Sequence, residues 1–378
     1  MNMKNNTIKK LLIMVLCAAL FLSSSQVVLA AEQKPLSREQ QIVEKMSLHE
    51  KVCQLFIVFP SDITGVYPVT EAGETTKKAL EEYPVGGILY DESNMKSPEQ
   101  LKNMVEKSQS FSKIPLFIVC DEEGGRVTRI QKTLGGTDIK PMYSYKDQGE
   151  ETARKNALSI SDNLKSYGFN MDFAPVADVW TNPDNKVIGN RAYSDDFDQA
   201  VKLVPAAVRG FSDKEILCTL KHFPGHGDSL EDSHHESVYV NKSLEELKNA
   251  ELKPFKAGID AGADMVMLGH MIVPQVDDKP ASLSEKWIQS VLRKDMGFQG
   301  IVITDSLKMK SISNKYGNNE AVLLAIKAGV DILLCPSDVK SAVQAIENAV
   351  EKGEIPESSI DESVKRIIKA KIKKEIIK

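Results

Sequence analysis

The sequence has no surplus of positive charge. It contains 48 Lys and Arg residues against 53 Asp and Glu residues, which gives a formal net charge of -5 at pH 7. Proteins that bind nucleic acids usually carry a basic surplus, because they must neutralise phosphate groups. We therefore expect no nucleic-acid partner. No obligate protein partner is evident either, so the simplest expectation is a monomer.

Cysteine is scarce, with five residues in 378. Cys17 lies in an N-terminal apolar run, and the other four lie in apolar stretches of strand character: Cys53, Cys120, Cys218 and Cys335. None of these four has the spacing of a metal site. A chain of this length can bury enough surface to fold without disulfides. We expect four packed free thiols.

The N-terminal apolar run, residues 11–22, is too short to cross a bilayer comfortably, since a helical span needs about 20 residues. Three lysines precede the run, and a small-residue site ending at Ala30 follows it, which is typical of a secretory signal. We predict a signal peptide at residues 1–30 and a mature protein that is secreted or held at the cell surface. An uncleaved N-terminal anchor is the alternative.

No internal repeat, low-complexity tract or Ser/Gly-rich linker interrupts the chain, which predicts a single domain over residues 31–378. Short apolar runs alternate instead with segments of helical periodicity. The runs lie at residues 52–59, 86–90, 116–120, 170–174, 215–220, 265–268, 300–304 and 330–334. The helical segments lie at residues 75–82, 98–110, 150–167, 198–211, 244–261, 284–295, 319–328 and 339–352.

This alternation predicts an α/β protein with a (β/α)8 TIM barrel. The strands are continuously apolar, which indicates a parallel sheet covered on both faces. A doubly wound open sheet is the alternative, but no glycine-rich dinucleotide fingerprint follows the first strand. A last helix at residues 363–378 should pack its apolar residues on the barrel and leave its lysines in solvent.

Polar residues that directly follow the strands should gather in one mouth, because all strands of a parallel barrel end on the same face. The set comprises Asp121 with Arg126 and Arg129, Asp178, Lys221 with His222, His270, and Asp305. The Asp305 carboxylate could cap the next helix or attack a bound substrate, and its position favours neither interpretation.

The most polar segment runs from Lys221 to His235 and contains four of the six histidines. Pro224 and two glycines make it a loop. Asp232 and His234, two residues apart, can be brought together by a turn, so that the carboxylate orients the imidazole and raises its proton affinity. Such a histidine can donate and recover a proton near neutral pH.

Other interpretations of this segment stay open. Its histidines could be incidental to a surface loop, or they could bind a metal. Pro and Gly interrupt the spacing of His222 and His226, which excludes a helical ligand pair and ranks metal binding below proton transfer. Lys221 and His222 could contact a substrate, or Lys221 could neutralise neighbouring acids. Arg191 lies in a loop after the fourth strand, and a single loop arginine is weak evidence for a functional site.

Four stretches occur in a fixed order: Asp121 to Arg129, Gly189-Asn190-Arg191, Lys221 to Gly227 followed by Asp232-Ser233-His234, and Thr304-Asp305. In this combination the chain resembles the bacterial β-N-acetylglucosaminidases of glycoside hydrolase family 3, over roughly residues 40–375. The resemblance implies a TIM-barrel exo-hydrolase that removes terminal β-linked N-acetylglucosamine with retention of configuration and without a cofactor. It implies Asp305 as nucleophile, His234 as general acid/base and Asp232 as its partner. The sugar-binding residues that it implies are Asp121, Arg129, Arg191, Lys221 and His222.

With these roles, His234 would protonate the glycosidic oxygen while Asp305 attacks the anomeric carbon, and neutral His234 would then activate water. Retaining glycosidases usually use two carboxylates about 5 Å apart, and here an imidazole would replace one of them. The expected substrates are cell-wall muropeptides or chitooligosaccharides. Transfer of the sugar to phosphate, and glycan binding without catalysis, are the alternatives.

Overall fold

The computed structural model describes residues 36–229 and 238–378. The chain divides into two compact units, residues 1–41 and 42–378. In the first unit, the described residues 36–41 include the start of α2 (Arg38–Val43). The predicted signal peptide and Cys17 lie outside the described residues.

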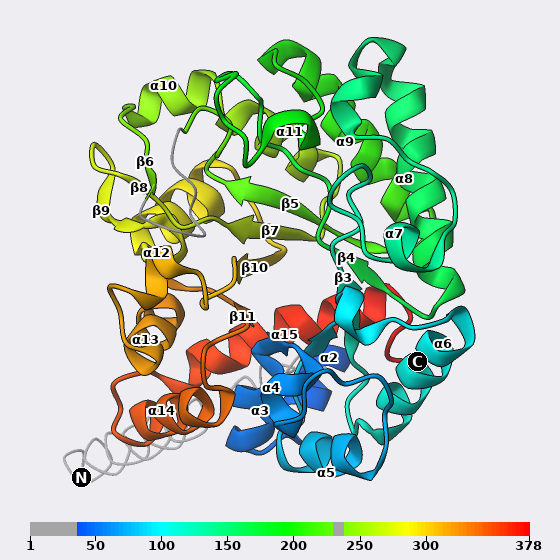
Figure 1. Ribbon diagram of the computed structural model, residues 1–378. Helices are drawn as coiled ribbons and strands as arrows, with labels where there is room; N and C mark the ends of the chain where they lie inside the picture. Colours follow the sequence, from blue (N-terminus) through cyan, green and yellow to red (C-terminus); the bar gives the residue numbers. More distant parts are fainter. Residues whose placement is uncertain (1–35, 230–237) are drawn as a thin grey trace, which may run out of the picture. The chain divides into compact units, whose positions relative to one another are not determined.

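The second unit is built on eight parallel strands in the order β10-β7-β5-β4-β3-β2-β1-β11. The two outer strands also meet, because Ile303 bridges Ile332 and the Thr304 amide donates to the Ile332 carbonyl at 3.0 Å. The sheet is thereby closed, and the predicted (β/α)8 barrel is confirmed (Figure 1). The strands are β1 (Phe56–Val58), β2 (Gly87–Leu89), β3 (Phe117–Cys120), β4 (Met171–Asp172), β5 (Leu217–Phe223), β7 (Met265–Leu268), β10 (Ile301–Thr304) and β11 (Leu333–Leu334).

Helices surround this barrel on its outside (Figure 1). The longer ones are amphipathic: α9, for example, buries Ala200, Leu203, Val204, Ala207 and Phe211 at three- and four-residue spacing. The α-helices of the unit are α3 (Leu48–Gln54), α4 (Pro60–Thr64), α5 (Glu74–Glu82), α6 (Pro98–Phe111), α7 (Ile130–Leu134), α8 (Gly149–Ser166), α9 (Phe197–Asp213), α10 (Leu244–Asn249), α11 (Leu252–Asp260), α12 (Lys310–Ser313), α13 (Asn318–Ala328), α14 (Val339–Glu351) and α15 (Glu357–Lys373). A π-helix, η5 (Lys286–Asp295), and four short 3₁₀ turns, η1 (Glu92–Asn94), η2 (Met142–Gln148), η3 (Gly189–Arg191) and η4 (Ala281–Leu283), complete it.

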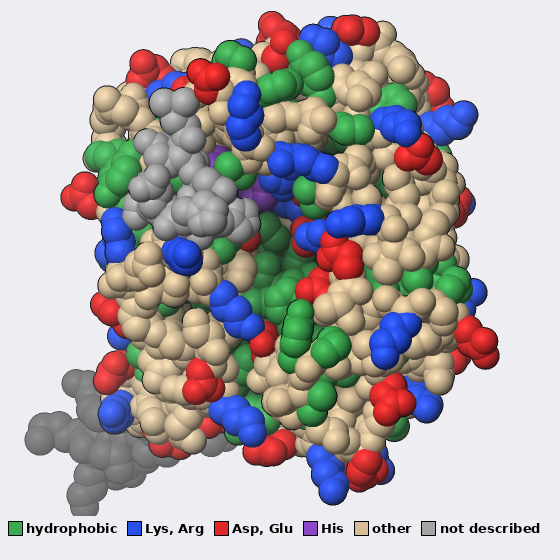
Figure 2. Space-filling view, in the orientation of Figure 1, with side chains coloured by type: hydrophobic (Ala, Val, Ile, Leu, Met, Phe, Trp, Pro, Cys, Tyr) green, Lys and Arg blue, Asp and Glu red, His purple; other side chains and the backbone are tan. Residues whose placement is uncertain are grey.

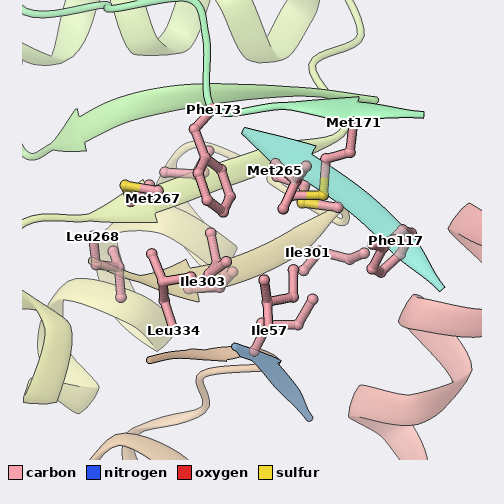
Figure 3. Close-up of a cluster of buried hydrophobic side chains, with 14 of the residues drawn as sticks. Ile57, Phe117, Met171, Phe173, Met265, Met267, Leu268, Ile301, Ile303 and Leu334 are labelled. Atoms are coloured by element: carbon pink, nitrogen blue, oxygen red, sulfur yellow. The ribbon is translucent and has the colours of Figure 1, made fainter. Parts of the chain in front are cut away.

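Apolar side chains fill the inside of the barrel (Figure 3). They come from strands on all sides, among them Ile57 of β1, Phe117 of β3, Met171 of β4, Met265 of β7 and Ile301 of β10. Each of these five is at most 1% exposed. Burying one such side chain stabilises a fold by about 1.5–3 kcal/mol. The interior is therefore a packed core, and it closes the floor beneath the carboxyl ends of the strands.

Three expected boundaries were wrong. Residues 52–54 belong to α3 and not to the first strand, because Ser47 and Glu50 form a reciprocal capping box and the helix that they start continues to Gln54. The expected helix at residues 244–261 is interrupted at Ala250, whose φ of -137° and ψ of -95° are not helical. The fifth strand extends beyond residue 220 to Phe223, which pairs with Leu268 across an irregularity.

A second sheet was not expected from the sequence. It contains β6 (Val238–Tyr239), β8 (Met271–Val273) and β9 (Asp277–Pro280), in the order β6-β8-β9. These strands belong to the segments that follow β5 and β7, and they lie together at one side of the barrel (Figure 1). Strands of two to four residues are too short to give a clear period in the sequence.

The last helix, α15, packs on the barrel as expected, with Ile360, Val364, Ile367 and Ile368 buried. One part of the expectation was wrong, because Lys371 is completely buried and not in solvent. Its ammonium group donates to Gln54 Oε1 at 2.8 Å.

The four cysteines in the described residues are buried free thiols, as predicted. Burial also raises the pKa of each thiol. None of the helices in the described ranges has the length and apolar character required to span a bilayer.

Candidate active site

A cavity of about 490 Å³ opens where the carboxyl ends of the barrel strands meet. Figure 2 shows a hollow on this face, with hydrophobic side chains inside it and Lys, Arg and His side chains beside it. Apolar residues of the barrel form part of the lining: Phe59, Leu89, Phe173, Met267 and Leu334. The polar lining contains all of the site residues that the resemblance implied outside the segment 230–237: Asp121, Arg129, Arg191, Lys221, His222 and Asp305.

Asp305 directly follows β10, and its amide continues the strand ladder by donating to Leu268 O at 2.8 Å. The helix α12 begins only at Lys310, with Met309 as its N-cap, so Asp305 does not cap it. Burial alone would raise the pKa of the Asp305 carboxyl, but His222, His270, the Ser306 amide and Lys221 hold that pKa below its ordinary value. Asp305 is therefore an ionised carboxylate at the cavity.

Lys221 and His222 are the fifth and sixth residues of β5, and not residues that follow the strand as expected. The peptide bond between them is cis, and both side chains line the cavity. The Lys221 ammonium lies 2.8 Å from Asp121 Oδ1 and 2.5 Å from Glu123 Oε1. Burial alone would lower the pKa of Lys221, but these two carboxylates raise it. Lys221 therefore stays charged although it is only 1% exposed.

The imidazole of His222 has a partner on each nitrogen. Nδ1 lies 2.7 Å from Asp178 Oδ2, and Nε2 lies 3.4 Å from Arg191 Nη2. A carboxylate only accepts hydrogen bonds and a guanidinium only donates them. The proton of a neutral His222 therefore belongs on Nδ1, which leaves Nε2 as an acceptor. Asp178 itself is buried and does not line the cavity, so it acts through His222.

Arg191 forms a two-pronged ion pair with Glu123, a residue to which sequence reasoning assigned no role. Arg191 Nε lies 2.8 Å from Glu123 Oε2, and Arg191 Nη2 lies 2.8 Å from Glu123 Oε1. Burial alone would raise the pKa of the Glu123 carboxyl, but Arg191 and Lys221 hold it far below its ordinary value. The sequence does contain a signal for Glu123, because three acids in a row follow the third strand. A single sugar-binding carboxylate would need only one of them, so the other two require cationic or amide partners.

The glycine pair after Glu123 makes a tight turn in which both residues have positive φ, +88° at Gly124 and +65° at Gly125. A Cβ at Gly125 would lie 2.6 Å from Pro141 Cγ. The turn brings the Glu123 amide within 2.9 Å of Val127 O. This is where a residue without a side chain is required, both by backbone conformation and by space.

Arg129 lines the cavity at the start of α7. Its guanidinium lies 3.0 Å from Glu92 Oε1 and 3.5 Å from Asp121 Oδ2. The buried Glu122 carboxylate accepts hydrogen bonds from the amides of Arg129, Ile130 and Gln131 at 2.7–3.0 Å. Glu122 thus satisfies the first amides of α7 and fixes the position from which Arg129 reaches the cavity.

Besides Asp178, two other residues that were expected in the mouth are not in the cavity lining. Arg126 donates to the backbone carbonyls of Lys186 and Val187 at 2.6 and 2.5 Å, so its guanidinium group stabilises the loop that contains these two residues. His270 is buried, with Nδ1 2.8 Å from Ser282 Oγ and Nε2 2.9 Å from Ser306 O. It supports the segment that follows Asp305. A position after a strand specifies the face but not the direction of the side chain.

A model of the glycosyl hydrolase family 3 N-terminal domain matches residues 47–370. The chain belongs to this family. A β-hexosaminidase of Stenotrophomonas maltophilia (strain K279a) is 34% identical over 287 residues, which are 74% of this chain and 84% of that protein. The resemblance expected from the four sequence stretches is thereby confirmed.

Solved structures of family 3 proteins have the same fold. A β-N-acetylglucosaminidase from Paenibacillus sp. str. FPU-7 superposes with a TM-score of 0.82 at 37% identity, over 88% of this chain and 63% of that one. This chain thus spans less than two thirds of the length of that protein. A β-glucoside phosphorylase, BglX, superposes with a TM-score of 0.79 at 25% identity, over 90% of this chain and 61% of that one.

Asp232 and His234, the acid/base pair expected in this family 3 chain, lie outside the described residues. Their roles stay a prediction. The described residues on either side are tied together, because Lys242 Nζ lies 2.8 Å from Asp228 Oδ2 and also contacts Glu251.

Metal binding was a weaker interpretation of the histidine-rich segment. Among residues 36–229 and 238–378, no three His, Cys, Asp or Glu side chains gather as a metal site. His226 has Nδ1 2.7 Å from Ser229 Oγ, and burial holds the pKa of its imidazole below the ordinary value.

Proposed function

We propose that the protein is an exo-acting, retaining β-N-acetylhexosaminidase that hydrolyses terminal β-linked N-acetylglucosamine. The observation that carries this proposal is the ionised Asp305 carboxylate in a cavity whose wall presents Lys221, His222 and Arg191. An ionised carboxylate can attack an anomeric carbon, and the cations and imidazole can hold sugar hydroxyls. The choice of N-acetylglucosamine as the sugar follows from the similar proteins, which are named β-hexosaminidase and β-N-acetylglucosaminidase.

The shape of the cavity supports action on a chain end. The packed core beneath it blocks any path through the barrel, so a ligand enters and leaves by the same mouth. Phe173, Met267 and Leu334, which line the cavity, belong to that core (Figure 3). A blind pocket accommodates the terminal residue of a glycan and not the middle of one.

In the proposed first step, Asp305 attacks the anomeric carbon while His234, oriented by Asp232, donates a proton to the leaving oxygen. In the second step, neutral His234 takes a proton from water, which attacks the glycosyl-Asp305 ester and releases the sugar with its original configuration. The chain's own groups supply positioning and electrostatic stabilisation, and the steps use no cofactor.

The test is turnover of 4-nitrophenyl N-acetyl-β-D-glucosaminide. The wild type should release nitrophenol, and Asp305→Ala should lose activity by at least about a thousandfold, since the covalent step is gone. Proton NMR of the first product should show the β anomer. Full activity of Asp305→Ala, or an α product, would reject the mechanism, and saturable binding without turnover would indicate a glycan-binding protein.

Phosphorolysis is a second candidate, supported by the structural likeness to a β-glucoside phosphorylase. An imidazole base repels an attacking phosphate less than a carboxylate base would. Turnover in the presence of phosphate distinguishes the two reactions. N-acetylglucosamine 1-phosphate as the main product would identify a phosphorylase, whereas free sugar at every phosphate concentration would identify a hydrolase.

We further propose that the substrates are cell-wall muropeptides or chitooligosaccharides and that the protein is exported after cleavage behind Ala30. Product analysis on a defined muropeptide and on chitobiose compares the two substrates. N-terminal sequencing of the protein from the culture medium and from the cell surface should begin at Ala31. Recovery of the uncleaved chain only from membranes would favour the anchor.

A further inference from the structure

We infer that Glu123 is a positioning residue for this reaction: its buried carboxylate fixes Lys221 and Arg191 in the orientation from which each presents one N–H to the sugar. The inference rests on the proposed function, because it assumes that the cavity binds a sugar. It concerns a residue that does not itself line the cavity.

The Glu123 carboxylate lies below the cavity wall, with its side chain 2% exposed. One oxygen, Oε1, is shared by the two cations, at 2.5 Å from Lys221 Nζ and 2.8 Å from Arg191 Nη2. The other oxygen, Oε2, accepts from Arg191 Nε at 2.8 Å. A single carboxylate therefore sets the separation of two cations that come from different elements, β5 and η3.

Arg191 has five N–H bonds, and acceptors in residues 36–229 and 238–378 use four of them. Two face Glu123, one on Nη1 lies 3.0 Å from Val187 O, and one on Nη2 faces His222 Nε2 at 3.4 Å. One N–H, on Nη1, is left for a ligand. The planar guanidinium cannot turn toward a ligand without breaking the pair with Glu123.

Lys221 is restricted in the same way. Among the described residues, two of its three N–H bonds face Asp121 and Glu123, which leaves one for a ligand. Asp121 is partly exposed in the cavity and can exchange its contact for a sugar hydroxyl, whereas Glu123 is enclosed and cannot. Glu123 is therefore the partner that keeps the ammonium in place when a ligand enters.

Glu123 also affects the charge of Lys221. The titratable and charged groups around this ammonium are Asp121, Glu123 and Arg191 and, less directly, Asp172 and Asp305. Burial lowers the pKa of Lys221, and Asp121 and Glu123 together reverse this. Without Glu123, Lys221 would lose its proton at a lower pH, and Arg191 would be a buried cation without a carboxylate at hydrogen-bonding distance.

The experiment compares Glu123→Gln with a matched control, Asp331→Asn. Asp331 is also a fully buried carboxylate between two cations, Arg293 at 2.6 Å and Arg366 at 2.9 Å, but it lies before β11 and does not line the cavity. Both substitutions remove one buried charge and keep the shape of the side chain. Both should lower the melting temperature, because each takes the carboxylate partner away from a largely buried arginine, Arg191 or Arg293.

Only Glu123→Gln should impair the reaction. Its kcat/KM toward the nitrophenyl substrate, per folded molecule at a temperature well below both melting transitions, should fall by about a hundredfold or more. The alkaline limb of its kcat/KM profile should become steeper, because an earlier deprotonation of Lys221 is added to that of His234. Glu123→Asp, which restores the charge, should return the limb toward the wild-type slope. The control should keep the wild-type profile.

A crystal structure of Glu123→Gln tests the positioning without any substrate. Lys221 and Arg191 should leave their wild-type positions, while the barrel backbone stays unchanged. Unmoved cations, or an alkaline limb with the wild-type slope, would overturn the inference even if the protein is a hexosaminidase. If the wild type turns over no β-N-acetylglucosaminide, the proposed function fails, and the crystal structure still decides whether Glu123 positions the two cations.

Discussion

Replacing Lys371 with methionine should remove a large part of the pH dependence of stability. Lys371 is 0% exposed, and its ammonium faces Gln54 Oε1 at 2.8 Å and the ring of Phe117 at 4.8 Å from the centroid. Neither partner is a carboxylate. Burial therefore lowers the pKa of Lys371 from 10.5 to about 7.

The sign follows from proton counting. Between pH 7 and 10.5 the unfolded chain holds a proton on this lysine and the folded chain does not, so the free energy of unfolding rises with pH in this window. A change of one pKa unit corresponds to about 1.4 kcal/mol, so the full rise is about 5 kcal/mol. The Phe117 ring favours the charged form by up to about 2 kcal/mol, which leaves an expected rise of about 3–5 kcal/mol.

Lys371→Met lacks this titration. At pH 6.5 it should be more stable than the wild type, because folding of the wild type must either neutralise the Lys371 ammonium or bury its charge, and both cost free energy. This difference in stability should disappear toward pH 9.5. The loss of the hydrogen bond to Gln54 costs about 1 kcal/mol at every pH. Urea unfolding followed by fluorescence of the buried Trp287 measures the difference.

The control is Lys352→Met, since Lys352 is exposed at the end of α14. Its stability should follow the wild type at every pH. The reasoning would be refuted if the stability difference between Lys371→Met and the wild type were the same at pH 6.5 and 9.5.

Three further substitutions test the support of the cavity. Asp178→Asn leaves His222 without its carboxylate partner, so kcat/KM should fall by about ten- to a hundredfold. The melting temperature should stay within a few degrees of the wild type, and unchanged kinetics would show that Asp178 does not position His222. Glu122→Gln weakens the cap of α7, and it should lower both the melting temperature and the affinity contributed by Arg129, which titration with N-acetylglucosamine would measure. Burial raises the pKa of Asp172 well above its ordinary value, which favours the neutral carboxyl, so Asp172→Asn should leave the pH profile and stability nearly unchanged. A large change in either would show that the carboxyl is charged.

The barrel could be predicted from the sequence because its period is clear. A continuously apolar strand between amphipathic helices is buried on both faces, and eight such units leave few alternatives. Residues 52–54 could not be assigned correctly, because Val52 and Cys53 are apolar in the same run as β1 but are buried through a helix. A short apolar run has no period that separates the two structures.

The cavity residues could be predicted because the fold brings strand ends together, and six residues from four stretches of the chain line one pocket. The direction of individual side chains could not be predicted. Arg126 and Arg129 are three residues apart in the same motif, yet Arg126 holds backbone carbonyls and Arg129 reaches the cavity. The difference comes from α7, which begins just after Arg129 and turns the chain.

Each of the three consecutive acids after β3 in this family 3 chain has specific partners, so none of them only separates the residues that line the cavity. Asp121 lines the cavity and accepts from Lys221, Glu122 caps the helix that carries Arg129, and Glu123 joins Lys221 to Arg191. Asp121 and Glu123 thus share Lys221, whereas Glu122 points to the amides of α7, and a tight turn at the glycine pair follows the triplet. Lys221 touches two of these acids, so replacing either one would disturb the cavity wall that we propose to bind the sugar, even if the replaced residue itself meets no sugar. The geometry of the proposed site therefore depends on carboxylates below its surface as well as on the groups that a ligand would contact.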